Sequence, residues 1–202
     1  MVRNIVFDIG NVMVYFRWHE LMEELSFSDD VIERLQHGMI MTDLWKELDR
    51  GILPEEQVIA KMKEKNEGLE HEIDLVFANA ERIVEQYKYT QKWLMDLKKR
   101  GYHLYYLSNY QRSFFECHKK KVFEFLPLME GGIVSAYVKL LKPDHAIYQK
   151  LLTNYGLRAE ECVFLDDTKV NIAAAKEVGM KGIVFETYEQ ASKELEQLLK
   201  EN

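Results

Sequence analysis

The chain has 202 residues, of which 47% are hydrophobic, and it carries a formal net charge of −7. This size predicts one large globular domain, or a core domain with a modest insert. The acidic balance argues against nucleic-acid binding, and no apolar run reaches the roughly 20 residues of a membrane helix. Cys117 and Cys162 lack any metal-ligand spacing, which predicts no disulfide framework. We therefore expect a cytoplasmic protein without a nucleic-acid or membrane partner.

Short apolar runs indicate where strands lie. Continuous apolar runs without alternation are typical of strands covered on both faces, as in a parallel sheet. Helical patterns between most of the runs end at glycine, as in the segment that has Thr90 as its predicted N-cap and stops at Gly101. Strand and helix alternate from residue 90 onward, which predicts a Rossmann-like three-layer α/β/α core with a mostly parallel sheet. The apolar runs are residues 5–7, 104–107, 131–138 (the weakest), 163–165 and 183–185.

Residues 17–88 have a different pattern, without a convincing strand. Leu44 and Leu48 share a helical face in a segment that ends at Gly51, and Pro54 precedes another helical pattern. The stretch that ends near residue 87 also has a helical pattern. We therefore predict a core made of residues 1–16 and 89–202, with an all-helical insert at residues 17–88, called the cap segment below.

Polar side chains follow three of the predicted strands. The first strand ends in Asp8, the second in Ser108 and Asn109, and the third in Asp166 and Asp167. In an open parallel sheet, ligands bind at the carboxyl ends of the strands. Carboxylates crowded at one edge repel one another, and a divalent cation removes this cost. Mg²⁺ takes carboxylate and phosphate oxygens, so the sequence predicts a magnesium and phosphate site.

Lys142 is a candidate for the same site. It precedes Pro143, which favours an extended lysine at the start of a helix. Most lysines are solvated surface residues, and only the position of Lys142 after the Ser108 strand singles it out. An ammonium group here would hold phosphoryl oxygens.

Four motifs in this order resemble the haloacid dehalogenase-like hydrolase superfamily. They are "VFDIGNV" with Asp8, "YLSN" with Ser108, "LKPD" with Lys142 and "VFLDDTKVNIAAA" with Asp166 and Asp167. The match extends from residue 4 to about 185, and the cap segment resembles the helical cap of that superfamily. The start of the chain is most similar to the sugar-phosphate phosphatase branch, which includes glucose-1-phosphate phosphatases and the phosphatase domain of soluble epoxide hydrolases.

The resemblance implies a Mg²⁺-dependent phosphatase that acts on a small-molecule phosphate ester. Asp8 would attack phosphorus to form an aspartyl-phosphate. Asp8, Asp167 and the carbonyl of Gly10 would hold Mg²⁺, with Asp166 acting through water or as a partner of Lys142. The phosphoryl oxygens would be held by Ser108, the Asn109 amide and Lys142. Asn171 would position the loop, or is simply a polar residue near a helix start.

Gly10 departs from the pattern of the resembled family. Most of its phosphatases carry a second aspartate there, which protonates the leaving group and then activates water. Three explanations stay open: a substrate with a good leaving group such as a sugar 1-phosphate, another proton donor (Tyr15, His19 or a water held by the cap), or a protein that is not a competent phosphatase. The last includes a 2-haloacid dehalogenase and a non-catalytic phosphometabolite-binding module.

Substrate choice is expected to depend on the cap segment and on side chains beside the core motifs. Trp45 stands at helical spacing from Leu48, so we expect it inside the cap core rather than against the substrate. An arginine near the site would pair with a second anionic group or a sugar hydroxyl. The candidates for substrate specificity are Tyr15, Arg17, Trp18, Tyr110 and Arg112.

Overall fold

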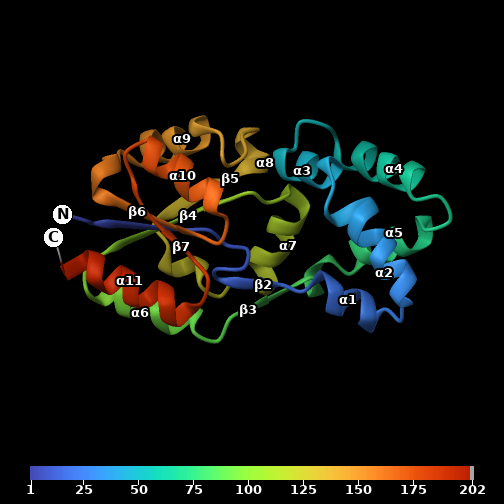
Figure 1. Ribbon diagram of the computed structural model, residues 1–202, viewed down its shortest axis with the longest axis horizontal. Coiled ribbons are helices and arrows are strands. Elements are labelled where there is room, and N and C mark those ends of the chain that lie inside the picture. The colour runs from blue at the N-terminus through green and yellow to red at the C-terminus, as the bar shows by residue number, and fades with distance from the viewer. Residues whose placement is uncertain (201–202) are drawn as a thin grey trace.

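The computed structural model describes residues 1–200 and contains a five-stranded parallel sheet (Figure 1). The strand order is β5-β4-β1-β6-β7, so the first strand lies in the middle. Ile5 of β1 pairs with Leu104 of β4 on one side and with Val163 of β6 on the other. The strands are β1 (Asn4–Phe7), β4 (His103–Ser108), β5 (Gly131–Val134), β6 (Cys162–Asp166) and β7 (Lys181–Val184).

Helices cover both faces of this sheet (Figure 1). Side chains alternate along β1, so Ile5 and Phe7 point into one hydrophobic cluster and Val6 into the other. The first cluster includes side chains of α6 (Thr90–Lys99) and α11 (Tyr188–Lys200). The second includes side chains of α9 (His145–Tyr155) and α10 (Lys169–Glu177). The predicted three-layer Rossmann-like fold is therefore confirmed.

The cap segment forms a group of helices at one end of the molecule (Figure 1). The chain leaves β1 through β2 (Val14–Phe16) and returns through β3 (Val84–Gln86), and these two strands pair antiparallel. Cap side chains such as Met39 and Met62 belong to the same hydrophobic cluster as Phe7 of the core. The elements are α1 (Trp18–Glu24), α2 (Asp29–Leu35), η1 (Gln36–Ile40), α3 (Asp43–Arg50), α4 (Glu55–Lys65), α5 (Glu70–Ala78) and η2 (Ala80–Arg82).

Three local expectations were wrong. The weakest predicted strand, residues 131–138, is a strand (β5) only up to Val134, and the rest of it, Ser135–Val138, forms the short helix α8. The last predicted cap helix ends early, because Asn79 donates a side-chain hydrogen bond to the Leu75 carbonyl and residues 84–86 then form β3. Val84 pairs with Phe16, a partner distant in sequence that overrides the local helical pattern. Thr90 is the first residue of α6 rather than its N-cap, since its hydroxyl donates to the Met13 carbonyl at 2.7 Å.

The remaining elements connect β4 to β6. They are α7 (Arg112–Lys121), η3 (Leu126–Leu128), α8 (Ser135–Val138) and η4 (Ala159–Glu161). Cys117 and Cys162 are both free thiols. Across residues 1–200, none of the helices has both the length and the apolar composition needed to cross a bilayer.

Candidate active site

The strand order brings the predicted site residues together. Because β1 lies between β4 and β6, the residues that end these strands meet at one edge of the sheet. Asp8 follows β1, Ser108 ends β4 and Asp166 ends β6. The backbone N–H of Asp8 donates to the Leu165 carbonyl at 2.8 Å, which continues the β1–β6 pairing up to the carboxylate.

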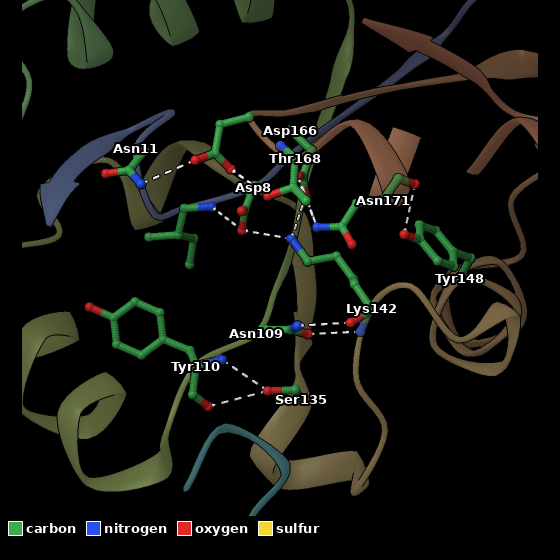
Figure 2. A network of polar contacts seen from close by, with 12 residues as sticks. Asp8, Asn11, Asn109, Tyr110, Ser135, Lys142, Tyr148, Asp166, Thr168 and Asn171 are labelled. Atoms are coloured by element: carbon green, nitrogen blue, oxygen red, sulfur yellow. Dashed lines mark hydrogen bonds and ion pairs between the residues drawn. The ribbon is translucent and has the colours of Figure 1, made fainter. Parts of the chain in front are cut away.

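Lys142 connects two of the carboxylates (Figure 2). Its Nζ lies 2.9 Å from Oδ1 of Asp8 and 2.6 Å from Oδ2 of Asp166. The Lys142 side chain is 1% exposed and that of Asp166 is fully buried, whereas that of Asp8 is 12% exposed. Asp8 is therefore the member of this triad that a ligand can reach.

Asp166 is held by several donors at once. Its carboxylate accepts hydrogen bonds from the Thr168 backbone N–H at 2.8 Å and from the Asn171 side-chain amide at 2.9 and 3.1 Å. The hydroxyl of Tyr148 in turn donates to the Asn171 carbonyl (Figure 2). This network fixes Asp166, and through it Lys142, before any ligand binds.

The charges in this cluster shift one another's pKa. Burial raises the pKa of Asp8 to about 7; Lys142 opposes this rise, and Asp166 and Asp167 add to it. Burial acts to lower the pKa of Lys142, but Asp8 and Asp166 raise it above its ordinary value. The lysine therefore stays protonated at neutral pH.

The three carboxylates fit a divalent cation. Oxygen atoms of Asp8, Asp166 and Asp167 all lie within 4.8 Å of one another. Both oxygens of Asp166 already accept hydrogen bonds, whereas Asp167 is partly open to solvent and accepts from Asn11 at 3.1 Å. Carboxylate oxygens are ligands that Mg²⁺ prefers, so Asp8 and Asp167 are the pair best placed to hold it directly.

The chain after β4 carries the predicted phosphate-binding residues. Ser108 is buried, and both Ser108 and Asn109 line the cavity that opens over Asp8. The Asn109 side chain accepts a hydrogen bond from the Lys142 N–H at 2.8 Å and donates one to the Lys142 carbonyl at 3.0 Å (Figure 2). These two bonds fix the backbone that carries the Lys142 side chain.

A cavity of about 260 Å³ opens over the carboxylates. Its size suits a small ligand. Asp8 and Asp167 lie on its core side, and the cap segment contributes Trp45 and Asp49 of α3. The full lining is Asp8, Gly10, Asn11, Phe16, Trp45, Asp49, Ile83, Val84, Ser108, Asn109, Tyr110, Gln111, Phe114, Asp167 and Thr168.

One of the five predicted substrate-specificity residues, Tyr110, lines this cavity, and its hydroxyl hydrogen-bonds at 2.7 Å to His118, which is buried and does not line the cavity. Arg112 instead lines a separate cavity beside α3, with its guanidinium 5.5 Å from the centre of the Tyr137 ring.

The other three candidates have partners away from the cavity. The hydroxyl of Tyr15 donates to Glu20, and Arg17 forms an ion pair with Glu24. The Trp18 ring contacts His19 at 5.4 Å between ring centres. None of the three residues lines the cavity over Asp8.

Sequence reasoning missed several residues of the site. Asn11 bonds Asp167, the Thr168 N–H bonds Asp166, and Ser135 accepts a hydrogen bond from the Tyr110 N–H at 2.9 Å (Figure 2). Asp49 was also missed, although it stands four residues after Trp45 and therefore on the same face of α3. An acid on the face that carries an aromatic residue was the available signal.

Fold and site together define an enzyme core that presents acidic groups and a lysine at the carboxyl edge of a parallel sheet. The sequence profile of the haloacid dehalogenase-like hydrolases matches residues 2–179, and the chain belongs to this family. The family resemblance read from the four motifs is thereby confirmed.

The chain is also similar to curated relatives and, in its fold, to solved structures. The chain is 25% identical over 195 residues to the sesquiterpene phosphatase astK of Aspergillus oryzae, covering 96% of this chain and 95% of that protein. It is 23% identical over 198 residues to the drimenol cyclase drtB of Aspergillus calidoustus, but spans 36% of that relative's length. A structure of the HAD family enzyme bt-2542 from Bacteroides thetaiotaomicron, in complex with magnesium and inorganic phosphate, has a TM-score of 0.73 at 18% identity, covering 94% of this chain and 98% of that chain.

Proposed function

We propose that this chain is a Mg²⁺-dependent phosphomonoester hydrolase that acts on a small phosphorylated metabolite through an aspartyl-phosphate on Asp8. One observation carries the proposal: Lys142 lies between Asp8 and Asp166, with Asp167 beside them, at the floor of a cavity of ligand size. The positive charges of the lysine and of a cation held by the acids suit a phosphoryl group, whose oxygens need positive charge. The phosphatase named among the relatives matches over 95% of its own length and supports this class of reaction.

The reaction has two displacement steps. An oxygen of Asp8 attacks phosphorus, the bond from phosphorus to the ester oxygen breaks, and the alcohol leaves after its oxygen takes up a proton. Water then attacks the aspartyl-phosphate, the bond from phosphorus to the Asp8 oxygen breaks, and inorganic phosphate leaves. Asp8 returns to its starting carboxylate, so the net reaction consumes one water per ester.

Each of the other residues has a part in holding the phosphoryl group. Lys142 supplies a fixed positive charge, and the Ser108 hydroxyl and the backbone amide of Asn109 supply donors at the cavity wall. Mg²⁺ held by Asp8, Asp167 and the Gly10 carbonyl would neutralise the carboxylates and the incoming phosphate. Asp166 is the partner of Lys142, as its 2.6 Å contact indicates.

The cavity walls favour a substrate with both a polar and an apolar face. Asp49, Asn109 and Gln111 offer polar atoms, as a sugar phosphate would need. The apolar wall of the cavity is formed by aromatic and aliphatic side chains, and these would suit the hydrocarbon chain of a prenyl phosphate, the second candidate substrate. That wall consists of Phe16, Trp45, Ile83, Val84 and Phe114.

Phosphate release from a panel of esters tests the proposal. The panel contains glucose 1-phosphate, glucose 6-phosphate, farnesyl phosphate and p-nitrophenyl phosphate, each assayed with Mg²⁺ and with EDTA. We expect release that requires Mg²⁺ and is lost in Asp8→Asn. The matched control is Asp96→Asn, which changes an exposed aspartate of α6 and should keep wild-type rates.

Two outcomes would overturn the proposal. Binding of phosphate esters without turnover would indicate a phosphometabolite-binding module. Chloride release from 2-chloropropionate in EDTA would indicate a dehalogenase.

A further inference from the structure

The proposed phosphatase lacks a proton donor in the position where its family usually has one. Gly10 stands two residues after Asp8, and apart from Gly10 and its two chain neighbours no atom lies within 4 Å of where its Cβ would be. An alkyl alcohol is a poor leaving group unless its oxygen is protonated as the bond breaks, a contribution worth about 10²–10⁴-fold. Under the proposed function, which this inference rests on, another group must supply that proton.

Neither side chain expected to replace the acid reaches the site. The hydroxyl of Tyr15 donates to Glu20, and the Tyr15 side chain is on the surface. His19 is exposed and lies 3.7 Å from Glu23 of its own helix. Both residues are absent from the lining of the cavity over Asp8.

Asp49 of the cap segment does line that cavity. It lies in the last turn of α3, on the face that carries Trp45, and Trp45 packs against Phe16 and Phe114 at the cavity wall. Asp8 of the core and Asp49 of the cap segment therefore open into one space. The cavity holds a third aspartate, Asp167, but this one belongs to the cation cluster.

The end of α3 is fixed to the core at Asp49 itself. The Ser135 hydroxyl donates to the Asp49 carbonyl while accepting from the Tyr110 N–H, and Lys139 donates to the Gly51 carbonyl. Gly51 ends α3 with φ +63°, and a Cβ there would lie 3.1 Å from Ala136 of α8. Glycine thus permits the close approach that holds Asp49 over the site.

The surroundings of Asp49 favour its neutral form. Among residues 1–200, no lysine, arginine or histidine forms an ion pair with Asp49 within 4.0 Å. Burial raises the pKa of Asp49 to about 7, and the charge of Asp8 adds to this rise. Lys142 and the backbone N–H of Gln111 act in the opposite direction. Tyr110, another titratable neighbour, stays neutral because burial raises its pKa far above the ordinary value.

We propose that Asp49 is the general acid and base of this enzyme, in place of the residue missing at position 10. The Asp49 carboxyl gives its proton to the ester oxygen as the bond from phosphorus to that oxygen breaks. The resulting Asp49 carboxylate takes a proton from the water that attacks the aspartyl-phosphate. Each turnover therefore returns both Asp8 and Asp49 to their starting states.

A leaving-group comparison tests this role. Asp49→Asn keeps the shape of the side chain but cannot donate the carboxyl proton. We expect kcat/KM for glucose 6-phosphate, an alkyl ester, to fall by about 10²-fold or more. For p-nitrophenyl phosphate, whose phenolate leaves without a proton, kcat/KM should stay near the wild-type value. Because kcat/KM reports only the steps through Asp8 phosphorylation, slow hydrolysis of the intermediate does not obscure the comparison.

The second half of the role has its own readout. With p-nitrophenyl phosphate, Asp49→Asn should release a burst of about one p-nitrophenolate per chain and then turn over slowly, because water lacks its base. The matched control is Asp43→Asn, an exposed acid in the first turn of the same helix that pairs with Lys46. This control should show wild-type rates on both esters.

Several results would overturn the assignment. An equal loss of kcat/KM on both esters would show that Asp49 only shapes the cavity, and no loss on either would show that it takes no part. If the wild-type protein released no phosphate from any ester, the proposed function would itself fail. Loss of all activity in Asp8→Asn together with full activity in Asp49→Asn would support the proposed phosphatase and refute only the role of Asp49.

Discussion

Removal of the Lys142 charge should destabilise the protein more than any surface ion pair could. Lys142→Met leaves Asp8 and Asp166 buried and close together without the ammonium group that lies 2.9 and 2.6 Å from them. Loss of one partner from a buried ion pair costs about 3–5 kcal/mol. For a chain of this length, that corresponds to a fall in Tm of about 6–20 °C. Asp166 keeps its hydrogen bonds from Asn171 and the Thr168 N–H in this variant. More of the lost stability should therefore come from Asp8 than from Asp166.

Thermal unfolding in EDTA and in saturating Mg²⁺ measures this cost. Lys119→Met is the control, because the side chains of Lys119 and its partner Glu116 are 37% and 39% exposed and surface pairs are worth about 0–1 kcal/mol. Mg²⁺ should raise the Tm of Lys142→Met more than that of the wild type, since the cation then neutralises charge that the lysine no longer shares. A fall in Tm of less than ~2 °C in EDTA would refute the ion-pair argument.

Three other substitutions test separate parts of the structure. Adding Gly10→Asp to Asp49→Asn should raise kcat/KM for glucose 6-phosphate at least about tenfold above that of Asp49→Asn alone, because there is room for the new acid. No increase would contradict the idea that Asp49→Asn is slow only because it lacks a proton donor. Gly51→Ala should lower the free energy of unfolding in urea by about 1–2 kcal/mol, because its φ is left-handed, and an unchanged value would contradict this. Burial lowers the pKa of His118 below its ordinary value of 6.5 in the folded protein. The stability gained from the neutral ring is therefore complete above pH 6.5 and is lost as the pH falls from 6.5 through the lowered pKa. His118→Gln should remove a slope of at most about 1.4 kcal/mol per pH unit in urea denaturation, and equal slopes in both proteins would exclude His118 as the source.

Much of the fold was predictable from local patterns. Apolar runs that stop at Asp8, Ser108 and Asp166 locate the strand ends, and parallel strands place their ends at one edge. The sheet and the covering helices follow from that alternation. Lys142 was found through its place before Pro143 and through family resemblance.

Other features depend on contacts between residues far apart in the sequence. The hydroxyl of Ser135 bonds the carbonyl of Asp49 across 86 positions, and no local pattern tells which face of α3 will turn toward the core. Trp45 was expected inside the cap core, but α8 holds α3 so that Trp45 lines the cavity while also packing on Phe77. The strand β3 was missed for the same reason, because Val84 acquires its strand partner, Phe16, only when the chain returns from the cap segment.

A single helix, α3, links the shape of the ligand space to proton delivery. Trp45 forms part of the wall that a leaving group would touch, and Asp49 would protonate that same group. One residue inserted ahead of Trp45 would rotate both side chains by about 100° and carry both away from Asp8 together. A single change in the sequence of α3 would therefore alter both the choice of substrate and the proton transfer to it. Asp8, Lys142 and Asp166 at the sheet edge would stay as they are.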